Sequence, residues 1–93
     1  MKRNETIDEV LQQHAGWIIE EKGLVKTFVF DSFEKAMKSM QELVPVIVGL
    51  NHHPDWKNSY NKVNVCLFTH DEDAVTKKDI ELLKIIEENW GKS

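Results

Sequence analysis

The segment from Tyr60 to His70 alternates between two sets of side chains, and this alternation limits the possible folds of the 93-residue chain more than any other feature. A period of two is that of a β-strand whose faces meet different surroundings. A strand with one apolar face needs a sheet that is covered on that face. One face would carry Val63, Val65, Leu67 and Thr69, and the other Asn64, Cys66, Phe68 and His70.

Two capping boxes mark the starts of a first and a last helix. Thr6 with Glu9, and Thr76 with Asp79, have the spacing in which the first side chain caps the helix and the second reaches back to the backbone of the first. The last helix is expected to run to about Trp90, just before a glycine.

The segment between Ser32 and Leu50 has the pattern of a longer amphipathic helix. Ser32 can act as its N-cap. Pro45 is expected to kink this helix or to end it nearby, because proline lacks the backbone N–H that the helix needs. The apolar stripe consists of Phe33, Ala36, Met37, Met40, Leu43, Val44 and Ile47.

Further strand signals complete the order of elements. Residues 17–19 and 24–30 flank the turn 20–23, which predicts a β-hairpin with Lys26 as the polar exception on its apolar face. Residues 56–59 either form an earlier paired strand or run on into the next one. The order α-β-β-α-β-β-α predicts an α+β fold, a four-stranded antiparallel sheet with helices packed on one face. We expect residues 1–93 to form a single domain.

The last helix has an apolar surface that is too broad for packing on one sheet alone. We therefore expect it to contact a partner subunit in a homodimer or homotetramer. The side chains concerned are Leu82, Leu83, Ile85 and Ile86.

Composition excludes several classes of protein. The net charge is −4 and the lysines are scattered among acids, which argues against direct binding to nucleic acid. The one cysteine, Cys66, excludes an intrachain disulfide and a Cys-rich metal site. No apolar run approaches the roughly 18 residues that a membrane span needs, and the first ten residues lack the apolar core of a secretory signal. We expect a cytoplasmic protein.

The stretch from Asn51 to Pro54 places His52 and His53 side by side, and His70 closes the predicted strand. Imidazole titrates near neutral pH, so these three side chains can accept and donate protons. Pro54 restricts His53 to extended conformations, which would aim the two adjacent rings in different directions. Because side chains at helix and strand ends can project into clefts, we expect a proton-transfer site there.

Residues 51–71, NHHPDWKNSYNKVNVCLFTHD, resemble the signature of the pterin-4a-carbinolamine dehydratase family. That signature has a doubled His followed by Pro, an acid and Trp, then Tyr-Asn-Lys-Val, and Thr-His at the end of the strand. Similar residues also occur at 16–17, 28–33 and 76–79, so the resemblance covers nearly the whole chain. Three histidines, three aromatics and a proline in register make the motif specific.

The resemblance implies an enzyme that dehydrates 4a-hydroxytetrahydropterin to quinonoid dihydropterin, with no metal or organic cofactor. The implied setting is tetrahydrobiopterin recycling beside an aromatic amino-acid hydroxylase. Loss of the hydroxyl group needs one proton delivered to oxygen and one removed from nitrogen. Imidazoles can do both, and a well-placed group contributes about 10²–10⁴-fold.

The resemblance also suggests roles for individual residues. His52 and His70 would be the acid and base at the two faces of the reacting centre, while His53 would bind the pterin ring and assist. Asp79 matches the family's acid at the start of the last helix, where it could orient a histidine or be only the capping partner of Thr76. The other residues expected in the substrate pocket are Asn51, Pro54, Thr69 and Asp71.

Two positions depart from the family pattern. Val48 stands four residues before His52, where the family usually has an acid that could orient a histidine and raise its pKa. Ala74 and Val75 replace Gly-Leu before the capping threonine, which would alter the loop after His70.

Three other interpretations are compatible with the sequence. The histidines could bind Zn²⁺, although the chain has no further cysteine and no carboxylate at an obligatory spacing. The chain could be a catalytically weak protein-interaction module that uses its helical face. It could also be a molybdopterin-related or other pterin binder whose pocket binds without turnover.

Overall fold

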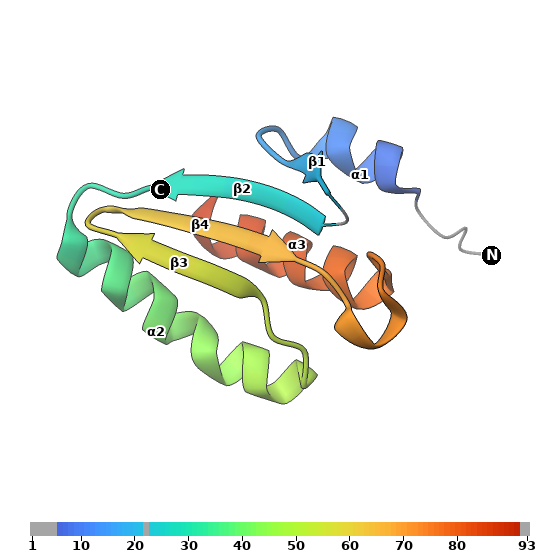
Figure 1. Cartoon of the computed structure of the whole chain (residues 1–93). Helices are drawn as coiled ribbons and strands as arrows, with labels where there is room; N and C mark the ends of the chain where they lie inside the picture. The colour runs from blue at the N-terminus through green and yellow to red at the C-terminus, as the bar shows by residue number, and fades with distance from the viewer. Residues whose placement is uncertain (1–5, 22, 92–93) are drawn as a thin grey trace.

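The computed structural model describes residues 6–21 and 23–91, which form a four-stranded antiparallel sheet with helices on one face (Figure 1). The predicted α+β class and order of elements are confirmed. Residue 22 of the predicted turn and residues 1–5 lie outside the described residues. The elements are α1 (Ile7–Gln13), β1 (Ile18–Glu20), β2 (Gly23–Val29), α2 (Phe33–Leu50), β3 (Asp55–Ser59), β4 (Lys62–Leu67), the short 3₁₀ helix η1 (His70–Glu72) and α3 (Lys77–Trp90).

The sheet has the strand order β1-β2-β4-β3, and all neighbouring strands are antiparallel. In the central pair, Leu24 lies opposite Leu67 and Phe28 lies opposite Val63. These four side chains are buried, as is Val65. The predicted alternation of β4 is therefore confirmed, and its apolar face is the face that the helices cover.

Lys26 is the polar side chain on this inner face, as predicted. Its ammonium group lies 2.6 Å from a carboxylate oxygen of Glu87, donates to the carbonyl of Ala15 at 2.9 Å, and lies 4.6 Å from the ring centroid of Phe28. Trp17 donates its indole N–H to the same Glu87 oxygen at 2.9 Å. These contacts compensate the charge of Lys26 and join β2 to α3.

The core lies between the sheet and the helices, and α3 contributes most to it. Leu82, Leu83 and Ile86 are fully buried within one chain, and Ile85 is half-buried. Val10 of α1 belongs to the same buried cluster, so helix α1 and the sheet share the wide apolar surface of α3. The breadth of this surface therefore needs no partner subunit to explain it, contrary to our reasoning from the sequence.

Helix α2 begins after Ser32, whose hydroxyl accepts the backbone N–H of Lys35 at 3.1 Å, and it continues through Pro45 to Leu50. The proline therefore does not end the helix, which was one of its two expected effects. Pro45 lies on the exposed side of α2. Water can reach the carbonyl of Gln41 there, which lacks its usual donor.

Part of the apolar stripe of α2 faces solvent in the single chain. Phe33 is 41% exposed and Val44 46%, and Val48, which lies outside the predicted stripe, is 64% exposed. The ring of Phe33 stacks on Tyr60 in the turn between β3 and β4, with centroids 6.4 Å apart. By contrast, Ala36, Leu43 and Ile47 of the same stripe are buried.

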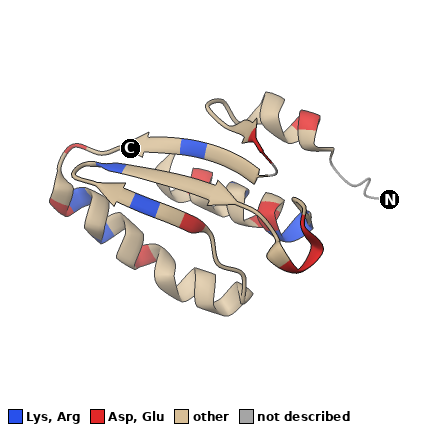
Figure 2. Cartoon of the chain, in the orientation of Figure 1, with Lys and Arg blue, Asp and Glu red and all other residues tan. Residues whose placement is uncertain are grey.

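The charged residues are distributed over many elements of the fold, as the sequence indicated. Lysines of the described residues are spread over β2, β3, β4, α2 and α3, and acidic residues are likewise spread over helices and strands, with a run of three at residues 71–73 in the loop between β4 and α3 (Figure 2). Within the described part of the chain, no helix is long and apolar enough to cross a membrane.

Candidate active site

The chain leaves helix α2 through Asn51, whose backbone adopts the left-handed conformation (φ 54°, ψ 39°). Asparagine enters this region more easily than most residues and commonly follows a helix end. Its N–H donates to the carbonyl of Val48 at 3.1 Å. His52 and His53 follow in the short irregular segment that leads into β3.

His52 is the most deeply placed of the three predicted histidines. Its side chain is 11% exposed, and its Nε2 lies 2.6 Å from Oδ1 of the fully buried Asp79. The other oxygen of Asp79 accepts the backbone N–H of Thr76 at 2.9 Å and the hydroxyl of Thr69 at 2.7 Å. Asp79 thus caps α3 and holds His52 at the same time.

The loop from β4 to α3 brings these groups together. The backbone of Thr69 exchanges two hydrogen bonds with Ala74, at 2.9 and 3.3 Å, and Asp73 takes the left-handed conformation between them (φ 53°). The hydroxyls of Thr69 and Thr76 lie 2.7 Å apart. Ala74, one of the departures from the family pattern, makes these bonds through its backbone.

His70 has a different environment. Its side chain is 71% exposed, and its Nε2 lies 3.3 Å from Oδ2 of Asp55, which is also largely exposed. The ring stands edge-on to Phe68, with centroids 5.0 Å apart. Water screens such an exposed, loose pair, so His70 can turn toward a molecule bound beside it.

A pocket of about 250 Å³ lies where these segments meet. Pockets for small molecules usually have about 300–1,000 Å³, so this one suits a compact ligand. All three predicted histidines line it, and Asp79 lies behind His52. The lining residues are Asn51, His52, His53, Phe68, Thr69, His70, Asp71 and Lys78.

Pro54 is the one predicted pocket residue that does not line this pocket. It borders a separate hollow on the sheet, together with Asp55, Trp56 and Lys57. Its contribution to the pocket is therefore indirect, through the extended backbone that it favours at His53.

The sequence analysis missed Phe68, Lys78 and the ion-pairing role of Asp55. The period of the strand already placed Phe68 on the same face as His70, so this signal could have identified it. Asp55 and His70 meet only through the tertiary fold, and Lys78 carries no signal beyond its place beside Asp79.

The departure at Val48 lies outside the pocket. Val48 is 64% exposed and is not among the lining residues. The carboxylate that contacts His52 comes instead from Asp79, on helix α3. A carboxylate therefore contacts His52 although position 48 is apolar.

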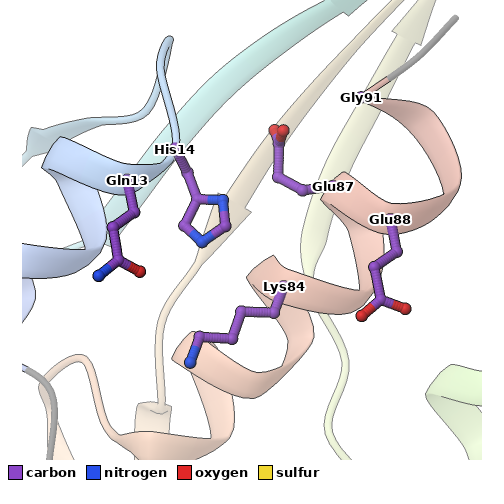
Figure 3. Close-up of a pocket in the computed structure, with 6 residues that line it drawn as sticks. All are labelled: Gln13, His14, Lys84, Glu87, Glu88 and Gly91. Carbon is purple, nitrogen blue, oxygen red and sulfur yellow. The ribbon is translucent and has the colours of Figure 1, made fainter.

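His14, the fourth histidine, lies elsewhere. It is half-buried at the end of α1 and faces an open hollow between α1 and α3 (Figure 3). This hollow shares no lining residue with the three-histidine pocket. Among residues 6–21 and 23–91, no three His, Cys, Asp or Glu side chains gather as a metal site requires, so the zinc interpretation gains no support.

The fold and the pocket define a small α+β protein with three histidines around one cavity and a buried carboxylate behind it. The family model for pterin 4 alpha carbinolamine dehydratase matches residues 2–89. The chain therefore belongs to the pterin 4 alpha carbinolamine dehydratase family, as its motif indicated.

Individual relatives agree with this assignment. A protein of Prochlorococcus marinus (strain NATL2A) is 37% identical over 81 residues, 87% of this chain and 85% of the relative. One of Opitutus terrae is 43% identical over 86 residues, 90% and 89% of the two chains. Both are named "Putative pterin-4-alpha-carbinolamine dehydratase". The crystal structure of a transcriptional coactivator/pterin dehydratase from Brucella melitensis superposes with a TM-score of 0.85 at 31% identity, over 90% of this chain and 92% of that one.

Proposed function

We propose that this protein dehydrates 4a-hydroxytetrahydropterin to quinonoid dihydropterin and water by histidine acid–base catalysis. The observation that carries the proposal is the meeting of His52, His53 and His70 around one pocket, with Asp79 buried behind the first of them. Family membership supports the same chemistry.

The reaction breaks the bond between carbon C4a and its hydroxyl oxygen. A proton must reach this oxygen so that it leaves as water, and a proton must leave the ring nitrogen N5 so that a C=N double bond forms. His52 and His70 come from different segments of the chain, so we assign them the acid and base roles on the two faces of a flat ring. His53, which is exposed, would bind the ring and assist proton transfer.

The remaining polar groups of the pocket would orient the pterin. We assign Asn51, Thr69 and Asp71 to binding, because they line the pocket beside the histidines. No step of this proposal uses a metal ion or an organic cofactor. Its setting would be the cytoplasmic recycling of tetrahydrobiopterin, beside an aromatic amino-acid hydroxylase that supplies the hydroxylated pterin.

The test is the dehydration of chemically prepared 4a-hydroxytetrahydropterin, followed by ultraviolet absorbance. His53→Ala should lower the rate by about 10²–10⁴-fold without unfolding the chain. His14→Ala is the matched control, because His14 lies outside the pocket, and it should retain the wild-type rate. Unchanged turnover in His53→Ala would contradict the proposal. Binding without turnover by the wild type would indicate a pterin-binding protein instead.

The exposed face of helix α2 favours a second function, in protein–protein interaction. Phe33, Val44 and Val48 expose apolar surface there, and the related Brucella structure is described as a transcriptional coactivator as well as a pterin dehydratase. We propose that this face packs against a second copy of the chain, in a homodimer or homotetramer. Val44→Asp with Val48→Asp should then reduce the mass found by sedimentation equilibrium, and a monomeric wild type would contradict the proposal.

A further inference from the structure

The hydrogen bonds behind His52 have directions that can be fixed by counting protons. Oδ2 of Asp79 accepts from the Thr69 hydroxyl at 2.7 Å and from the Thr76 backbone at 2.9 Å. A carboxylate has no proton to donate, so the single hydroxyl proton of Thr69 is directed to Asp79. The 2.7 Å contact between the two threonine hydroxyls therefore requires Thr76 to donate to Thr69.

The same count determines the form of His52. Its Nε2 lies 2.6 Å from Oδ1 of Asp79; with Asp79 as a carboxylate, this oxygen can only accept, so Nε2 would carry the proton. Neutral His52 is then the Nε2–H tautomer, with the lone pair on Nδ1. Because Nε2 is held by Asp79, Nδ1 is the ring nitrogen left to exchange a proton with a molecule in the pocket.

We propose that Thr69 and Thr76 are positioning residues, a hydroxyl relay that orients Asp79 and thereby holds His52 in the Nε2–H tautomer with Nδ1 as its working atom. Asp79 is fully buried and Thr69 is 5% exposed, so water cannot easily replace a missing donor. The effect on turnover rests on the proposed dehydratase function, but the tautomer itself can be measured without substrate.

The sharpest variant is Asp79→Asn, which keeps the shape of the side chain. Two donors, the Thr69 hydroxyl and the Thr76 N–H, meet at the position of Oδ2, so the amide oxygen should occupy that position. The amide NH₂ would then face Nε2 of His52, which must accept. We expect His52 to change to the Nδ1–H tautomer and to lose the lone pair on Nδ1. In a Ser–His–Asp triad, the same replacement gives the wrong tautomer and a loss of about 10⁴-fold.

Long-range ¹H–¹⁵N correlation spectra of protein labelled at histidine show which ring nitrogen carries the proton. The His52 signals are assigned by their loss in His52→Gln. The wild type should show Nε2–H at a pH where the ring is neutral, and Asp79→Asn should show Nδ1–H. Thr69→Val should give a mixture of tautomers, while Thr69→Ser keeps the hydroxyl and the single form. A wild-type Nδ1–H tautomer, or an unchanged tautomer in Asp79→Asn, would overturn the proposal.

Kinetics provide the second measurement. Thr69→Val should lower kcat by about 10- to 100-fold, a loss within the range for one acid–base group, and Thr69→Ser should recover most of it. Equal kcat in Thr69→Val and the wild type would overturn the positioning role. If Thr69→Val does not fold, the His52 tautomers of the wild type and of Asp79→Asn still test the proposal. A wild type with the expected tautomer but no dehydration would disprove the proposed function and leave the relay standing.

Discussion

The pocket contains two histidine–aspartate pairs with the same chemistry and opposite surroundings. His52 and Asp79 lie 2.6 Å apart, with side chains 11% and 0% exposed, whereas His70 and Asp55 lie 3.3 Å apart and are 71% and 66% exposed. A buried pair is stable only when its remaining polar atoms are also satisfied. The Thr69 hydroxyl and the Thr76 N–H do this for Asp79.

This difference suggests how the two pairs divide the proposed work. By our proposal, the buried pair holds one imidazole in a fixed orientation and protonation form. The exposed pair leaves the other imidazole free to adapt to the ligand, since water and salt screen its partner. Each of the following experiments either removes a member of one pair or measures how far the two pairs differ.

The largest expected effect is on folding stability. Asp79→Ala would leave the His52 ring, the Thr69 hydroxyl and the Thr76 N–H without their acceptor, so the free energy of unfolding should fall by about 3–5 kcal/mol. Asp55→Ala should change it by less than about 1 kcal/mol, because the pair is exposed. Urea unfolding of both variants measures the difference, and similar losses would show that burial does not distinguish the pairs.

A smaller effect concerns the coupling within each pair. A double-mutant cycle with alanine at positions 52 and 79 should give a coupling free energy of about 2 kcal/mol or more that is nearly independent of salt. The same cycle at positions 70 and 55 should give about 0.5 kcal/mol or less, decreasing further at high salt. A larger coupling for the exposed pair would reverse the comparison.

The smallest expected effect is on the reactivity of the Cys66 thiol. Cys66 lies opposite Asp55 in the β3–β4 ladder. Burial raises the pKa of the Cys66 thiol, and the charges of Asp55 and, less strongly, Asp79 raise it further. Asp55→Asn should therefore lower the pKa of Cys66 more than Asp79→Asn does. Alkylation by iodoacetamide at a fixed pH should then be faster in Asp55→Asn, by less than about tenfold. A faster reaction in Asp79→Asn would contradict this order.

The same shift has a consequence for stability. The pKa of the thiol is higher in the folded chain than in the unfolded chain, so ionisation favours unfolding. The contribution of Cys66 is fully present below the unfolded-state pKa and is lost as the pH rises through the folded-state pKa. Urea unfolding across alkaline pH, with Cys66→Ala as the control, measures this loss.

Local patterns predicted most of the fold because they report local constraints. The alternation in β4 and the two capping boxes depend only on near neighbours in the chain, and all were confirmed. The breadth of the apolar surface on α3 was also read correctly. The sequence did not predict that other elements of the same chain cover this surface, because periodicity shows how wide a surface is and not which element packs on it.

The site was predictable only in part, for the same reason. The motif identified the three histidines, but the partner of His52 lies 27 positions away, at Asp79. The capping box explained one oxygen of Asp79, and only the packing of α3 beside the segment that follows α2 shows what the other oxygen contacts. The His70–Asp55 pair likewise depends on the register between the β3–β4 ladder and the following loop.

The most direct test of the account is to add 7,8-dihydrobiopterin, which lacks the hydroxyl group at C4a that the proposed reaction removes, to protein labelled at histidine. We predict that the imidazole signals of His52, His53 and His70 move with one common affinity while those of His14 stay in place. Shifts of His14 alone, or no shift of the other three at millimolar ligand, would contradict the assignment of this pocket to a pterin.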